Sequence, residues 1–165
     1  MTAEVIITTR AAAGFPVFQG IGSGVVQAAY GVTEIASGNL LEANDIIKFC
    51  KVPAGATIIG GWIYGDDIDT GTETLDIDIG WAANGGTGTW DAVDTDGFGN
   101  LGTITGDAIT DLKPVAGIIY PLQGLLLADG PITFTRETTI TAIVNTAAAG
   151  GAVGTLSMVV FYLVD

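Results

Sequence analysis

Residues 74–81 alternate strictly between apolar and polar side chains, and this pattern restricts the fold more than any other feature of the chain. The odd-numbered positions hold Leu75, Ile77, Ile79 and Trp81, whereas the even-numbered ones hold Thr74, Asp76, Asp78 and Gly80. A period of two with one apolar face is typical of a β-strand that is buried on one side only. The segment therefore predicts a sheet that packs its apolar face against a second layer.

Runs of β-forming residues recur along the chain from residue 24 on, with turn residues between them. The candidate strands are 25–30, 45–52, 57–64, 74–81, 117–120, 132–136, 138–145 and 155–164. No run of about 12 or more residues shows the 3.6-residue period of a helix. Residues 33–44 are consistent with a further strand or with a short helical turn. We expect residues 82–116 to form surface loops with one short strand near 101–105.

These runs predict an all-β fold, an antiparallel jelly-roll-like sandwich, in preference to a propeller or a solenoid. We expect residues 24–165 to form a single β-sandwich domain. Residues 1–23 combine a short β run, 5–9, with a stretch, 11–23, that contains glycine and proline punctuation and two phenylalanines, Phe15 and Phe18, without a strand pattern. They predict an extended N-terminal arm. The arm either lies along its own domain or reaches a neighbouring molecule.

The chain carries little charge with which to cover a free surface. Charged residues make up 14% of the sequence and apolar residues 48%, whereas about 25% charged residues is usual. In the last strand, Val159, Phe161 and Leu163 alternate with a second apolar set, so both faces are apolar. That second set is Leu156, Met158, Val160, Tyr162 and Val164. We therefore expect one face to meet the core and the other to meet another subunit, with Phe15 and Phe18 as further contacts.

Charge argues against nucleic acid as a partner. The chain has 18 acidic and five basic residues and a net charge of −13. The basic residues are scattered, and nucleic-acid binding relies on clustered lysine and arginine. No apolar stretch approaches the roughly 20 residues that span a bilayer, so a membrane partner is not expected. The first residues also lack the pattern of a signal peptide, which favours synthesis in the cytoplasm.

The residue types that most enzymes use for catalysis are scarce. There is no histidine, and the single cysteine, Cys50, lies in an apolar run where free cysteine is usually a small buried hydrophobe. Residues 97–102 match the letters G-x-G-x-x-G, but no βαβ unit surrounds them, so no cofactor is expected. Asp76 and Asp78 lie on the same face of a strand as residues i and i+2. The carboxylates of glycosidases can have a similar separation, but any strand with an acidic face produces it. We expect no enzyme activity and no catalytic residues.

Two acidic clusters leave a cation as an open alternative. They are Asp66, Asp67 and Asp69 in one turn and Asp91, Asp94 and Asp96 in a later loop. Oxygen-rich loops can hold Ca²⁺, but neither matches the calcium-loop pattern, and aspartate is also common in turns because its side chain caps backbone N–H groups. We expect turn stabilisation and no metal.

Aromatic residues raise a second alternative, because flat rings can stack on sugars. Trp62 and Tyr64 share one strand face, Trp81 ends the apolar face of residues 74–81, and Trp90 lies in a polar loop. Packing in the core or at an interface is the more common role of such residues. We expect Trp90 to be the most exposed of the four.

Three segments of the chain resemble one family of proteins. They are 51–56 (KVPAGA), the acidic turn 66–71 (DDIDTG) and the strand 74–80 (TLDIDIG). Together they resemble the head decoration, or cement, proteins of tailed bacteriophages. The resemblance implies a jelly-roll-like fold, a homotrimer that binds the major capsid protein on the capsid exterior of the virion, and stabilisation of the shell. A different phage tail- or fibre-associated β domain and a carbohydrate-binding module are the alternatives.

Overall fold

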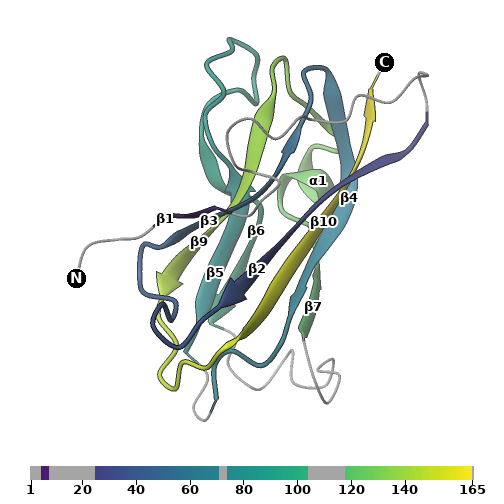
Figure 1. The fold of residues 1–165 in the computed structure, drawn as a ribbon. Helices are drawn as coiled ribbons and strands as arrows, with labels where there is room; N and C mark the ends of the chain where they lie inside the picture. Colours follow the sequence, from purple (N-terminus) through teal and green to yellow (C-terminus); the bar gives the residue numbers. More distant parts are fainter. Residues whose placement is uncertain (1–4, 8–24, 71–73, 104–117, 165) are drawn as a thin grey trace.

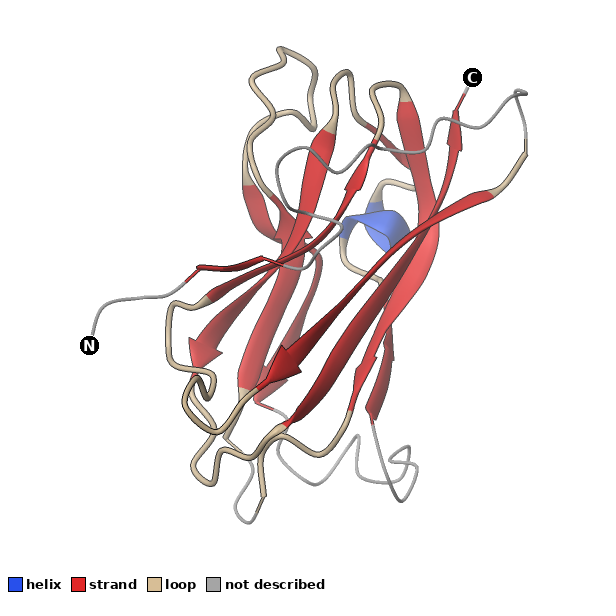
Figure 2. Cartoon of the chain, in the orientation of Figure 1, coloured by secondary structure: helices blue, strands red, loops and turns tan. Residues whose placement is uncertain are grey.

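The computed structural model describes residues 5–7, 25–70, 74–103 and 118–164, which form two β-sheets packed face to face (Figure 1). Nearly all of the regular structure is strand (Figure 2). The first six strands are β1 (Val5–Ile7), β2 (Gln27–Ile35), β3 (Ile46–Val52), β4 (Ala56–Gly65), β5 (Asp76–Trp81) and β6 (Asp94–Thr103). They are followed by β7 (Ile118–Pro121), α1 (Leu125–Ala128), β8 (Ile132–Thr133), β9 (Thr138–Thr146) and β10 (Gly154–Val164).

The strand order is that of a jelly roll. The first sheet has the order β1-β3-β9-β5-β6, and the second has the order β2-β10-β4-β7, with β8 also paired to β4. The chain passes repeatedly from one sheet to the other, which produces the double Greek key of this fold. The pairs among the described strands are antiparallel except β1 with β3, which is parallel. The predicted all-β antiparallel jelly-roll-like sandwich is confirmed.

The strands form where the alternating pattern places them. In β5, Ile77, Ile79 and Trp81 are at most 3% exposed and point into the sandwich. The turn between β3 and β4 lies at residues 53–55, as the Pro-Ala-Gly sequence predicts. Gly55 has a positive φ of 78° there, a conformation that favours glycine. The N–H of Ala56 closes the turn on the carbonyl of Pro53 at 3.1 Å.

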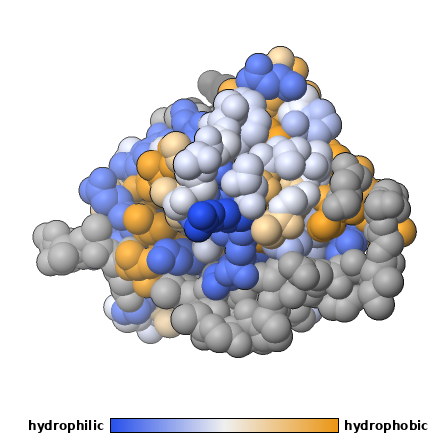
Figure 3. Space-filling model, turned by 90° about the horizontal axis from the view of Figure 1, so that it is seen from above, coloured by the Kyte–Doolittle hydropathy of each residue, from blue (hydrophilic) through white to orange (hydrophobic). Residues whose placement is uncertain are grey.

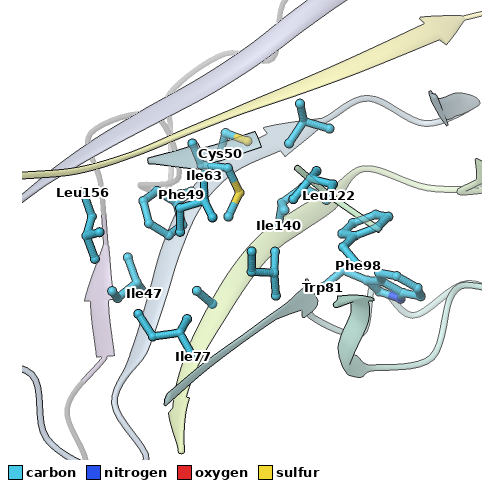
Figure 4. Packing of buried hydrophobic residues seen from close by; sticks show 14 of the residues in the cluster. Ile47, Phe49, Cys50, Ile63, Ile77, Trp81, Phe98, Leu122, Ile140 and Leu156 are labelled. Atoms are coloured by element: carbon cyan, nitrogen blue, oxygen red, sulfur yellow. The ribbon is translucent and has the colours of Figure 1, made fainter. Parts of the chain in front are cut away.

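The core fills the space between the sheets (Figure 4). At one end Trp81 packs against three rings, with centroid distances of 4.9 Å to Phe98, 5.3 Å to Phe134 and 6.5 Å to Trp90. The indole Nε1 of Trp81 donates a hydrogen bond to the carbonyl of Ala92 at 2.8 Å, so this buried polar group is satisfied. Cys50 is 1% exposed, which confirms its prediction as a buried residue, and burial raises the pKa of its thiol to about 12.

The segment 82–103 differs in part from its prediction. Residues 82–93 form a loop as expected, but β6 occupies residues 94–103, where we expected loop structure up to residue 101. This prediction was wrong because glycine and aspartate obscure the alternation of β6. The strand is stabilised by pairing with β5 and by Phe98, which is fully buried. Tertiary contacts thus override a weak local preference.

The sequence left the structure of residues 33–44 open. β2 continues to Ile35, so the first part of 33–44 is strand, and turns follow. The helix α1 has four residues, and within the described ranges no helix has the length and apolarity needed to cross a membrane.

Only a small part of the N-terminal arm belongs to the described residues. There β1 pairs in parallel with β3, with Val5 opposite Ile46. Phe15 and Phe18 lie outside the described residues, so their contact role and the boundary at residue 23 stay predictions.

Candidate assembly surface

Three neighbouring strands of the second sheet, β2, β10 and β4, place apolar side chains on the side that faces away from the core. Figure 1 shows these strands side by side. We call this surface the aromatic face and define it by Tyr30, Val32, Trp62, Tyr64, Val159 and Phe161. The first four are 46%, 49%, 39% and 44% exposed, and the two β10 residues are half-buried. Solvent-exposed apolar side chains gathered in this way mark interaction sites more often than singly scattered ones do.

Strand register brings these side chains into rows. Val159 lies between Tyr30 on β2 and Trp62 on β4, and in the next row Ser157 lies between Val32 and Tyr64. The rings of Trp62 and Phe161 meet edge to face, with centroids 5.0 Å apart and planes at 75°. This is a favourable aromatic geometry, so the rings of Trp62 and Phe161 hold each other in place.

Polar contacts border the aromatic face at the end where β10 begins. The backbone N–H of Thr155 donates to the Asp66 carboxylate at 2.8 Å, and the Thr155 hydroxyl donates to the Glu34 carboxylate at 3.3 Å. Toward the opposite end, the hydroxyls of Thr57 and Thr133 are hydrogen-bonded at 2.8 Å. The apolar region therefore ends in polar residues where β10 begins, whereas the exposed Val25, Val26 and Ile59 adjoin it toward the other end.

The two apolar sets of the last strand lie on opposite sides of β10, as predicted. Leu156, Met158, Val160 and Tyr162 are buried in the core, whereas Val159, Phe161 and Leu163 are half-buried on the outer side. Leu163 pairs with Thr57 beyond a β-bulge and adjoins the aromatic face. The contact of Val159, Phe161 and Leu163 with another subunit stays a prediction.

Sequence reasoning did not identify Tyr30 and Val32 as members of this surface. A usable signal was present, because β2 alternates, with Thr33 and Ile35 buried and Tyr30, Val32 and Glu34 exposed. The assignment of Tyr30 to the same patch as Trp62 required the pairing of β2 and β4 with β10, and that pairing joins residues far apart in the chain.

The exposure of the tryptophans also differs from the prediction. Trp90 is half-buried against Trp81, and Trp62 is the more exposed residue at 39%. Trp90 is drawn inward because the loop 82–93 folds over the end of the core, where the ring of Trp81 is available for an edge-to-face contact.

The first acidic cluster stabilises a turn. The Asp69 carboxylate is 6% exposed and accepts hydrogen bonds from the backbone N–H groups of Thr74 at 2.6 Å, Leu75 at 2.8 Å and Gly150 at 3.2 Å. These bonds tie the segment before β5 to the loop between β9 and β10. The carboxylate thus has the capping role that aspartate commonly takes in turns.

The second cluster contains a similar carboxylate. Asp91 accepts hydrogen bonds from the side chain of Asn84 at 2.8 Å, from the N–H of Gly88 at 2.7 Å, and from both the N–H and the hydroxyl of Thr135. The hydrogen bonds from Thr135 and Asn84 hold the pKa of Asp91 well below its usual range. Among the described residues, no three acidic or cysteine side chains are grouped so as to hold a metal ion.

Other carboxylates crowd the outer side of the first sheet. Burial raises the pKa of Asp78, and the nearby carboxylates of Asp76 and Asp96 raise it further, while a hydrogen bond with Asn145 opposes the shift. Burial and the carboxylate of Asp96 likewise raise the pKa of Asp94. The Oδ1 atoms of Asp76 and Asp78 are buried without a hydrogen-bond partner. Because Asp78 is only 8% exposed, this pair is poorly placed to reach a substrate.

The end of the sandwich near residues 53–55 and 82–93 has a different surface character. Seen from above in Figure 3, hydrophilic and neutral residues occupy the middle of this end, and hydrophobic residues lie toward its sides.

Neither a protein-family model nor a curated protein matches the sequence. Solved structures match in fold over nearly the whole chain. A chain in the capsid of Ralstonia phage GP4 has a TM-score of 0.71 and 18% identity, and the match covers 98% of both chains. For a chain of the cyanophage Pam1 capsid asymmetric unit the TM-score is 0.63 and the identity 22%, over 95% of this chain and 98% of that one.

A third match is a chain in the acidic stable capsid structure of Helicobacter pylori bacteriophage KHP30. Its TM-score is 0.56 and its identity 14%, over 87% of this chain and 92% of that chain. At these identities the similarity is one of fold. The chain therefore shares its jelly-roll fold with chains from three phage capsid structures.

Proposed function

We propose that this protein is a structural component of a phage virion, a decoration or cement protein that binds the outer capsid surface and stabilises the shell. The observation that carries the proposal is the fold match to a chain of the Ralstonia phage GP4 capsid over 98% of both chains. The resemblance of residues 51–56, 66–71 and 74–80 to decoration proteins supports the finer role. The protein would act by binding, without catalysis and without a cofactor.

The proposed mechanism depends on buried area at two kinds of contact. Copies associate as a homotrimer, and each trimer binds the major capsid protein across adjacent capsomers on the capsid exterior. Separating the capsomers then requires breaking these contacts as well, so binding stabilises the assembled shell by mass action. The 18 acidic residues against five basic ones favour a basic docking surface on the capsid protein.

Residues 1–23 are proposed to contribute to capsid attachment through Phe15 and Phe18. The support is in the sequence, where two large apolar residues occur in a segment without a strand pattern. A segment of this kind can become ordered on contact with a neighbouring molecule.

A capsid-binding experiment tests the proposal. Capsids that lack the protein are mixed with the purified chain or with a variant lacking residues 1–23, and occupancy and the temperature of capsid disruption are measured. We expect the full chain to bind and to raise the disruption temperature, and the shortened variant to bind at least roughly tenfold more weakly. Absence of binding by the full chain would overturn the proposal, and equal occupancy of the two would remove the arm from it.

Two other functions make different predictions. The exposed rings of Trp62 and Tyr64 favour a carbohydrate-binding module as a second candidate, and it predicts that a glycan changes tryptophan fluorescence. A tail- or fibre-associated domain predicts that the protein purifies with tails and is missing from heads.

A further inference from the structure

We propose that the aromatic face is the surface through which copies of this chain bind one another. This assignment adds an interface to the proposed homotrimer. It rests on the proposed function, in which copies lie side by side on a capsid. It assigns the contact to the outer side of β2, β10 and β4 and leaves the acidic surfaces of the molecule for other partners.

Charge identifies a second copy as the occupant. Every copy has a net charge of −13, so two copies repel each other wherever their carboxylates approach. None of the six residues of the aromatic face is charged, and Glu34 and Asp66 lie only at one end of it. Copies can therefore meet here at a low electrostatic cost. A basic partner, by contrast, would gain no charge complementarity from this face.

The side chains of the aromatic face are suited to a protein interface that buries apolar area. Trp62 and Tyr64 are 39% and 44% exposed, and each combines a large apolar ring with one polar atom. Such residues lose little conformational entropy on binding and are enriched at the centres of protein interfaces. Because Phe161 already holds the Trp62 ring edge to face at 5.0 Å, part of the surface is ordered before a partner arrives.

The sizes of the side chains in neighbouring rows of the face are compatible with self-association. The row of Tyr30, Val159 and Trp62 stands next to a row in which Phe161 is flanked by Ala28 and Gly60. A Cβ atom added at Gly60 would meet nothing within 4 Å, so this second row is low at that end. The open space beside Gly60 can therefore receive a side chain of a neighbouring copy in a symmetric oligomer.

Val159→Lys is the most direct test, because Val159 lies between Tyr30 and Trp62 in the aromatic face and its side chain is half-buried on the outer side. Lysine there places a charge in the contact of every copy. We expect the wild-type chain to sediment as an oligomer and Val159→Lys to associate at least roughly tenfold more weakly. The matched control is Val153→Lys, at a 58% exposed position outside the aromatic face, which should keep the wild-type mass. Circular dichroism and thermal melting check the fold of both variants.

A second substitution keeps the test decisive if the Val159→Lys variant does not fold. Tyr64→Lys changes a 44% exposed residue of β4 and should weaken association in the same way. A monomeric wild-type chain, or variants that keep the wild-type oligomer, would overturn the inference. Variants that stay oligomeric but lose capsid binding would also overturn it, because the capsid protein would then be the occupant. An oligomer that depends on the face but binds no capsid would sustain the inference and reject the proposed function.

Discussion

At the level of single residues, the carboxylates of Asp91 and Asp78 have opposite effects on stability. Asp91 is surrounded by donors from Asn84, Gly88 and Thr135, which lower its pKa. Asp78 is buried beside other carboxylates, and its Oδ1 has no hydrogen-bond partner, so its pKa is raised. Burial and the supply of local donors therefore decide the opposite effects of these two aspartates on the stability of the fold.

The direction of each pKa shift determines its pH dependence. The lowered pKa of Asp91 means that its contribution to stability is present above the unfolded value of about 3.9 and is lost as the pH falls. The raised pKa of Asp78 means that its charge costs stability at neutral pH. That cost disappears as the pH falls from the folded-state pKa through the unfolded value.

We predict opposite effects for the same substitution at these two positions. At pH 7, Asp78→Asn should raise the melting temperature by a few degrees, because it removes a buried charge that neighbouring carboxylates repel. Asp91→Asn should lower the melting temperature, because an amide cannot accept all of the hydrogen bonds that the carboxylate accepts. Melting curves from pH 7 to about pH 3 should show both differences shrinking as acid is added. Equal destabilisation by the two variants at pH 7 would contradict this assignment.

At the level of secondary-structure elements, the sheet edge formed by β6 depends on a close approach between a strand and a ring. A Cβ atom at Gly97 would lie 2.3 Å from the Trp81 ring. Phe98, the next residue, is fully buried with its ring 4.9 Å from that of Trp81. Glycine at 97 therefore allows β6 to lie against β5 while Phe98 completes the aromatic end of the core.

Gly97→Ala should destabilise the protein by about 1–3 kcal/mol, the usual cost of overpacking a core. The midpoint of chemical denaturation measures this change. Gly38→Ala is the matched control, because a Cβ atom there would meet nothing within 4 Å, and a change within about 0.5 kcal/mol is expected. Denaturation midpoints that agree between the two variants would show that Trp81 does not restrict position 97.

At the level of the whole molecule, a net charge of −13 coexists with an uncharged aromatic face on one sheet. Long-range repulsion between copies and short-range apolar attraction therefore act in opposition. Salt screens the first and leaves the second largely intact, because the Debye length is about 10 Å at 0.1 M and about 3 Å at 1 M.

Self-association should therefore become stronger as sodium chloride rises from about 0.05 M to about 0.5 M. Sedimentation equilibrium at several protein concentrations measures the association constant at each salt concentration. Val153→Lys, which removes one unit of net negative charge outside the face, should associate at least as well as the wild type at low salt. Association that weakens with salt would instead indicate an interface held by ion pairs, which the aromatic face does not provide.

Several features followed from the sequence because they depend on neighbouring residues alone. The period-two pattern of 74–81 predicted a strand with one buried face, and the two apolar sets of β10 predicted opposite sides of one strand. The apolar context of Cys50 predicted its burial. These inferences hold because side chains alternate across any strand, whatever it pairs with.

The tertiary structure decided which of these strands lie together. The pairing of Tyr30 with Val159 and of Val159 with Trp62 assembles the aromatic face from three distant segments, and the burial of Phe98 against Trp81 makes a strand of glycine-rich β6. Strand pairing and register depend on the packing of the whole core. A local sequence pattern does not encode them when several possible neighbouring strands are equally apolar.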